Sequence, residues 1–201
     1  MADEQVLDVV GQSVAISSPG KVFFRERGET KLDLVRYYLA VAEPLMGAVR
    51  GRPTLMQRFP RGAEGTSFFQ KRVPESAPGW LQTTIVSTPN GTTARALVLA
   101  DMAHVVWAVN LACLGFHVWP YLADRPDVAD ELRLDLDPQP GTDFEVARGD
   151  AEVVTHRFRC RARRQVMRYF RAGLEWRRTP YLDKSLRVAY VNSCHCGNHF
   201  S

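Results

Sequence analysis

The stretch LQTTIVSTPNGTTARALVLA, residues 81–100, gives the clearest structural signal in the chain. Two runs rich in β-branched and apolar residues flank Pro89-Asn90-Gly91, and Asn-Gly is the pair that tight hairpin turns prefer. A helical pattern follows from about Met102 to Phe116, and after it comes a strand pattern, ELRLDLDP, at 131–138. A hairpin, a helix and a further strand indicate helices packed on a sheet.

The chain before this hairpin shows the same mixture. Apolar and polar residues alternate over 5–24, and PTLMQRF (53–59) and SFFQKRVP (67–74) are further strand candidates. Because strands follow one another both as hairpins and across helices, residues 1–145 predict one α+β unit with a mixed sheet.

One helix is expected between these strands. Thr30 and Asp33 form a capping-box pattern, which predicts a helix from there to about Val49. Pro44 lies inside this helix and is expected to kink it or end it early.

Composition and charge limit the classes of function. With 201 residues, 45% of them hydrophobic, and a formal net charge of +4, the chain is globular and mildly basic. This charge permits a polyanionic partner without requiring one. The acidic N-terminus lacks a secretory signal, and the apolar run 103–123 contains polar residues and a proline, so we expect a buried helix and no membrane partner. Four cysteines without an export signal fit a reduced, cytoplasmic protein.

Asp135 and Asp137 alternate with leucines on the last expected strand. Side chains two residues apart lie on one face of a strand, and neighbouring carboxylates repel unless a cation lies between them. The pair therefore predicts a Mg²⁺ or Mn²⁺ site of the kind used in phosphoryl or nucleotidyl transfer. Metal-dependent phosphatases and sugar-nucleotide transferases use a similar pair, and an edge strand on which Arg133 pairs with Asp135 would need no metal.

Other single residues leave two interpretations each. His117, within LGFHVWP, is either a packed core residue or part of a site. On a strand, Phe68 and Phe69 would point to opposite faces and one would be buried; in a loop both could stack on bases. Lys21 and Lys31, taken alone, are solvated charges.

The character of the sequence changes after about Arg148, where arginine becomes dominant. We therefore divide the chain into residues 1–148 and an arginine-rich tail, 149–201. Cys194-His195-Cys196 and His199 are zinc-ligand types, but their spacing is tighter than that of zinc knuckles and argues against a zinc site.

Six stretches, in this order, resemble one known family: SSPGKVFF, ETKLDLVRYYLAVAEPLM, GRPTLMQRFPRG, SFFQKRVPESAPGW, ALVLADMAHVVWAVNLACLGFHVWP and ELRLDLDPQPG. The family is the polymerase domain of bacterial ATP-dependent DNA ligase D and its stand-alone relatives, in the archaeo-eukaryotic primase superfamily. The resemblance covers about residues 13–145. It implies the mixed-sheet α+β fold of a primase-polymerase.

The resemblance also implies roles for individual residues. Asp135 and Asp137 would be two of three metal-binding carboxylates, with His117 beside them contacting the incoming nucleotide. The remaining roles concern DNA: 5′-phosphate binding by Ser18, Lys21 and Lys31, stacking on the template by Phe68 and Phe69, and other nucleic-acid contacts by Arg58 and Lys71.

The function implied is nucleotidyl transfer from NTP or dNTP, with Mn²⁺ or Mg²⁺, to a primer end at gaps or double-strand breaks during non-homologous end joining. The DNA partner would carry a 5′-phosphate. No ligase domain is recognisable, so a separate DNA ligase and an end-binding repair protein are expected partners.

The chain departs from the family after the Asp-Leu-Asp strand. The family continues with a Ser-Gly-x-x-Gly-x-His turn that binds triphosphate and later with a strand bearing the third carboxylate, and neither pattern follows Gly141. We expect a fold incomplete at its C-terminus and a tail of truncated, out-of-frame or foreign origin. Whether the chain is an active enzyme is left open; the alternative is an inactive relative that only binds 5′-phosphorylated DNA ends.

Overall fold

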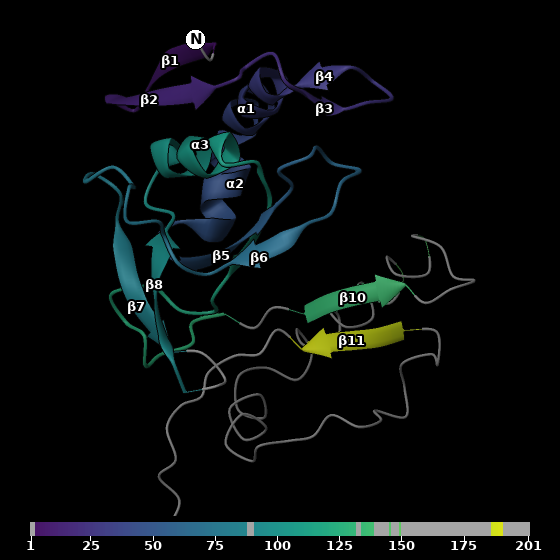
Figure 1. The fold of residues 1–201 in the computed structure, drawn as a ribbon. Coiled ribbons are helices and arrows are strands. Elements are labelled where there is room, and N and C mark those ends of the chain that lie inside the picture. The colour runs from purple at the N-terminus through teal and green to yellow at the C-terminus, as the bar shows by residue number, and fades with distance from the viewer. Residues whose placement is uncertain are drawn as a thin grey trace, which may run out of the picture. The chain divides into compact units, whose positions relative to one another are not determined.

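The computed structural model describes residues 3–87, 91–131, 134–138, 145, 149 and 186–190 (Figure 1). The chain contacts divide these residues into two units, with a boundary between residues 132 and 133. Among the described elements, strands β10 (Leu134–Pro138) and β11 (Leu186–Tyr190) belong to the second unit, and all others belong to the first.

Strand β5 (Pro53–Arg58) is the centre of the main sheet in the first unit. Along one edge it pairs with β9 (Cys113–Val118); along the other it pairs with β8 (Thr93–Val98) near its start and with β6 (Phe68–Gln70) near its end. Strand β7 (Thr83–Ser87) extends the sheet beyond β8. A single strand therefore holds the sheet together through both of its edges.

The predicted α+β class is confirmed, and so is the predicted hairpin, in which Ser87 pairs with Thr93. Every strand pair that the structure describes is antiparallel, so the expected mixture of pairings does not appear in this part of the chain. The reason is the place of β5. Strands β8 and β9 run in the same direction on either side of a helix, but β5 lies between them, so no parallel ladder forms.

Two small hairpins come from the N-terminal region. Strand β1 (Glu4–Val9) pairs with β2 (Gln12–Ser17), and β3 (Val22–Phe24) pairs with β4 (Glu29–Thr30). They confirm the short strands expected over residues 5–24. Gly11, in the β1–β2 turn, has a φ of 77°, a left-handed conformation that glycine adopts without strain.

The helical region predicted from Thr30 to about Val49 is present as two helices, α1 (Lys31–Ala40) and α2 (Ala42–Val49). The capping box is confirmed, because Thr30 and Asp33 exchange side-chain to backbone hydrogen bonds. The break lies just upstream of Pro44, whose ring would clash with the carbonyl four residues earlier in a continuous helix.

The helix predicted from Met102 to Phe116 is wrong in its second half. Helix α3 spans Met102–Asn110, Ala112 takes a left-handed φ of 65°, and strand β9 begins at Cys113. A short apolar run fits a buried strand as well as a buried helix, so periodicity could not place this boundary. The backbone N–H of Phe59 donates to the Ala112 carbonyl at 2.7 Å and fixes the turn against the end of β5.

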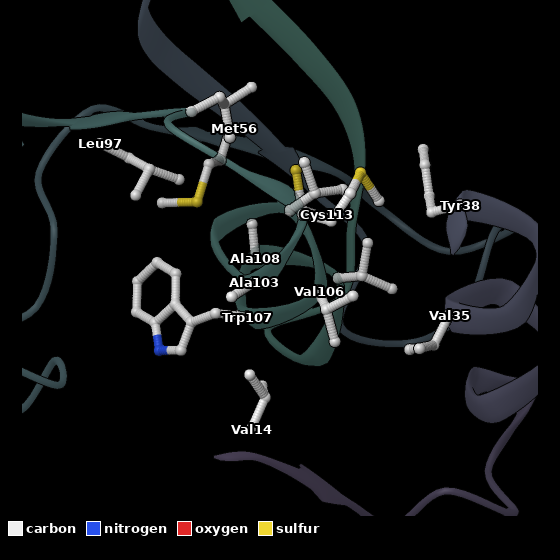
Figure 2. Packing of buried hydrophobic residues seen from close by; sticks show 14 of the residues in the cluster. Val14, Val35, Tyr38, Met56, Leu97, Ala103, Val106, Trp107, Ala108 and Cys113 are labelled. Atoms are coloured by element: carbon white, nitrogen blue, oxygen red, sulfur yellow. The ribbon is translucent and has the colours of Figure 1, made fainter. Parts of the chain in front are cut away.

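Helix α3 is the centre of the hydrophobic core. All of its residues from Met102 to Val109 are buried, which is possible only for a helix covered on every side. Figure 2 shows Val14 of β2, Val35 of α1 and Leu97 of β8 around Val106 and Trp107 of this helix. The main sheet, α1 and the β1–β2 hairpin therefore share one core.

No helix in the described part of the chain has the length and apolar character needed to cross a bilayer.

The second unit confirms the predicted Asp-Leu-Asp strand. In the antiparallel pair of β10 and β11, Asp135 lies opposite Ala189 and Asp137 lies opposite Arg187. Strand β11 falls in the arginine-rich segment of the sequence. The division after residue 148 stays a prediction, and Cys194, His195, Cys196 and His199 lie outside the described residues.

We predict that Leu97→Ala lowers the free energy of unfolding by about 2–5 kcal/mol, because Leu97 is 0% exposed and its loss leaves a cavity in the core. Ile85→Ala on the adjacent strand β7 is the matched control: Ile85 is 64% exposed, so its truncation should cost less than about 1 kcal/mol. Urea denaturation of both variants measures the difference. Equal losses would contradict the arrangement of the core.

Candidate nucleic-acid interface

Strands β6, β5 and β9 bring an aromatic residue and a histidine together on one face of the main sheet. Gln57 of β5 pairs with Phe69 of β6 and with Gly115 of β9, and His117 lies two residues beyond Gly115. Residues paired across a ladder share a face, so the four positions are neighbours. The rings of Phe69 and His117 meet edge to face, with centroids 5.3 Å apart and planes at 77°.

Gln57 fixes the orientation of His117. Its side-chain Oε1 lies 3.3 Å from His117 Nε2, and since an amide oxygen can only accept, Nε2 carries the hydrogen. The neutral ring therefore has Nδ1 as its acceptor atom. The amide nitrogen of Gln57 donates in turn to Ser67 Oγ at 3.4 Å.

Gly115 leaves the room that this pair needs. A Cβ atom at position 115 would lie 2.8 Å from Gln57 Oε1 and 3.3 Å from His117 Nε2. The interpretation of His117 as a packed core residue is wrong, because its side chain is exposed at the edge of the sheet. Its contacts are polar on one side and aromatic on the other.

Phe68 lies on the opposite face of β6, over Arg58. The guanidinium carbon is 5.3 Å from the ring centroid, a cation–π distance. Arg58 Nε also donates to the Leu111 carbonyl at 2.6 Å, and Nη1 donates to Gln70 Oε1. Burial lowers the pKa of Arg58, but a guanidinium stays charged at any physiological pH. These bonds hold a cation against the aromatic ring.

Both phenylalanines are exposed, Phe68 by 45% and Phe69 by 55%. The expectation that a strand would bury one of them is wrong. Strand β6 has only three residues, and its burial pattern leaves the side chains on both of its faces exposed. Lys71 follows β6 directly and is partly exposed.

Lys21, Lys31 and Ser18 form a second cluster, near the end of β2. Ser18 has a φ of 49°, and Lys21 Nζ donates to the Pro60 carbonyl. Lys31 is 6% exposed, so the interpretation of this residue as a solvated surface charge is wrong. Its ammonium donates to the carbonyls of Ser17, at 2.5 Å, and Asn110, at 3.1 Å. Burial, and then the charge of Lys21, lowers the pKa of Lys31.

The acidic pair, Asp135 and Asp137, is placed by the backbone of β10. Positions 135 and 137 alternate along β10, as the sequence predicts, in the unit separate from the two clusters above. Among the residues that the structure describes, no three His, Cys, Asp or Glu side chains gather as a metal site. A metal site at Asp135 and Asp137 therefore stays a prediction.

Gln57, Gly115 and Asn110 were not recognisable as site residues from the sequence. None belongs to a residue type that signals chemistry by itself, and their importance appears only when strand register and helix ends are known. Gly115 fell inside the helix expected from Met102 to Phe116, so its close approach to β5 could not be foreseen.

The fold is similar to that of a solved "Polymerase Domain from Mycobacterium tuberculosis Ligase D in complex with DNA". The TM-score is 0.59 at 30% sequence identity, and the match covers 71% of this chain and 54% of that chain. The family model described as "LigD, primase-polymerase domain" matches residues 30–164. The chain belongs to this family, which confirms the resemblance seen in the sequence.

Two longer LigD proteins are also similar to this chain in sequence. The "Multifunctional non-homologous end joining protein LigD" of Mycobacterium bovis is 34% identical over 138 residues, which are 65% of this chain and 18% of that protein. The "Bifunctional non-homologous end joining protein LigD" of Bacillus subtilis is 31% identical over 138 residues, 69% of this chain and 22% of that protein. The chain thus spans about a fifth of the length of the relatives that it matches.

We predict that Gly115→Ala displaces the Gln57 amide and breaks its hydrogen bond to His117, because the new methyl group occupies the space of Gln57 Oε1. The end of the glutamine can move, but its Cβ, 3.0 Å from the new methyl group, is fixed to β5, so the loss of stability should be about 1–3 kcal/mol. Nitrogen NMR shifts of the His117 ring report the loss of the fixed Nε2–H. Gly79→Ala, where a Cβ meets nothing within 4 Å, is the control. Unchanged His117 signals in Gly115→Ala would refute the role of Gly115.

Proposed function

We propose that this chain binds gapped or broken DNA ends and transfers nucleotides to a primer 3′-hydroxyl, as a LigD-type primase-polymerase in non-homologous end joining. The observation that carries the proposal is the pair of exposed aromatic side chains on β6, one beside His117 and the other beside Arg58. A related polymerase domain solved in complex with DNA supports DNA as the partner.

The aromatic pair suits an enzyme that copies any template. Base stacking contributes about 1–3 kcal/mol per base and tolerates every base, because each has a π-face. Phe68 and Phe69 point to opposite faces of one short strand, so they can separate two neighbouring bases or stack on two strands at a junction. Arg58 adds positive charge at the same place.

The lysine cluster suits a phosphate at the DNA end. Lys21 and Lys31 are close enough for the charge of one to lower the pKa of the other, and an anion between them relieves that repulsion. Lysine acts on phosphate as a point charge and reads no sequence. Ser18, in the adjoining turn, offers a hydroxyl to the same phosphate.

Asp135 and Asp137 fit the metal ions that the family implies. Both are hard oxygen donors at alternate positions of one strand, which is the donor chemistry that Mg²⁺ and Mn²⁺ prefer. When bound, such ions neutralise the attacking and leaving oxygens of nucleotidyl transfer. The role of this chain is to hold the carboxylates, and through Gln57 to present His117 Nδ1 as an acceptor toward an incoming NTP or dNTP.

An end-binding role without polymerisation is the second candidate. It is favoured by one sequence observation, the lack of a Ser-Gly-x-x-Gly-x-His pattern after Gly141. The aromatic and lysine clusters both lie in the first unit, so they do not depend on the missing pattern. A separate DNA ligase and an end-binding repair protein would complete joining in either case. The family match gives no support to a phosphatase or sugar-nucleotide transferase.

We predict that the chain extends a primer on a gapped duplex bearing a 5′-phosphate when NTPs and Mn²⁺ are supplied. Asp135→Ala and removal of the metal by EDTA should each abolish extension, because Asp135 is a proposed metal ligand. Gel analysis of the extended primer checks this. If the folded native chain binds the gapped duplex but does not extend the primer, it is an end binder and not a polymerase.

We predict that Phe69→Ala weakens binding to gapped DNA by about fivefold to a hundredfold, the equivalent of one lost stacking contact. The variant should fold normally, because the side chain is 55% exposed. Ile85→Ala, an exposed apolar residue on β7, should bind as the native chain does. Fluorescence anisotropy with labelled DNA measures both. Equal affinities for all three chains would exclude stacking by Phe69.

A further inference from the structure

Asn110, the last residue of α3, connects that helix to the lysine cluster. Its side-chain Oδ1 accepts from the Ser17 backbone N–H at 2.9 Å and from the Ser17 hydroxyl at 3.2 Å. The same oxygen lies 3.4 Å from Lys31 Nζ, and the Asn110 backbone carbonyl accepts from that ammonium at 3.1 Å. One residue therefore positions both Lys31 and the end of β2.

Among the described residues, the hydrogen-bond partners of the Lys31 ammonium are neutral. It donates to the carbonyl and hydroxyl of Ser17 and to the two oxygens of Asn110. Within the described part of the chain, no carboxylate lies at ion-pair distance from it. Buried lysines are rarely left without an acidic partner. The C-terminal end of α3 supplies only partial negative charge.

An aspartate at position 110 would have nearly the same shape and would give Lys31 a full counter-charge. The amide in its place satisfies the same donors and leaves the positive charge unbalanced. Burial and the charge of Lys21 lower the pKa of Lys31, which means that the charged form is held at the expense of folding stability.

We propose that Asn110 is a positioning residue of the phosphate site, and that it must be a neutral amide so that Lys31 and Lys21 keep a net positive charge for the 5′-phosphate of a DNA end. The inference rests on the proposed function of the lysine cluster as an end-binding site. This role makes Asn110 less stabilising than an aspartate would be at the same position.

The proposal predicts that Asn110→Asp changes thermal stability and DNA affinity in opposite directions. Asn110→Asp keeps the acceptor for Ser17 and pairs with Lys31, so the melting temperature should rise. The added charge cancels the field of the site, so affinity for a gapped duplex with a 5′-phosphate should fall about tenfold or more, while affinity for the same duplex with a 5′-hydroxyl changes less. If Asn110 had a purely structural role, the melting temperature and the affinity for the 5′-phosphorylated duplex would rise or fall together.

The experiment uses the full chain, thermal unfolding and anisotropy with both duplexes. Asn110→Ala removes the acceptor and should lower the melting temperature. Gln82→Glu, at an exposed position just before β7, makes the same change in net charge away from the cluster and should reproduce neither effect. The inference holds if Asn110→Asp is more stable and loses the preference for the 5′-phosphate.

Two outcomes would overturn the inference, and they differ in what else they overturn. If the native chain prefers the 5′-phosphate and Asn110→Asp retains that preference, or is less stable than the native chain, the role of Asn110 is wrong but the end-binding site stands. If the native chain does not distinguish the two duplexes, the proposed end-binding function fails, and the inference about Asn110 fails with it.

Discussion

The pairing of β5 along both of its edges is the constraint on which the rest of the first unit depends. It places β9 on one side and β8 and β6 on the other, although these segments come from distant parts of the chain. Because side chains alternate along a strand, Gln57 and Arg58 serve opposite faces and support His117 and Phe68 respectively. The aromatic surface therefore follows from the register of one central strand.

Helix α3 joins this surface to the lysine cluster. Its buried body packs between the sheet, α1 and the first hairpin, and its last residue, Asn110, binds Lys31 and Ser17. A fully buried helix has little freedom to shift, since every direction meets packed side chains. The position of Lys31 relative to the sheet is thus set by the same core that gives the domain its stability.

Much of the fold was predictable because its signals are local. The capping box at Thr30, the break near Pro44 and the hairpin around residues 89–91 each depend on neighbours in sequence. The end of α3 was not predictable, because most residues of 103–123 are apolar and the choice between helix and strand at Cys113 is made by pairing with β5.

The residues of the candidate site also fall into two groups, those that could be predicted from the sequence and those that could not. Residue types with distinctive chemistry, such as Phe68, Phe69 and His117, could be named from the sequence, and family resemblance gave them roles. Their exposure could not be predicted, because it depends on β6 being short and uncovered. Gln57 and Asn110 could not be found at all, since a neutral amide becomes significant only through the groups that surround it.

The short length of β6 also bears on how the protein avoids sticking to itself. A long, apolar edge strand would offer a row of unpaired backbone groups to a second molecule, and two exposed phenylalanines would strengthen that contact. Three residues give such a contact little length, and Lys71 and Arg72 follow at once, so that two copies meeting edge to edge would bring like charges together. The exposed aromatic side chains of β6 can thereby stay free of contacts with a second copy of the chain in solution.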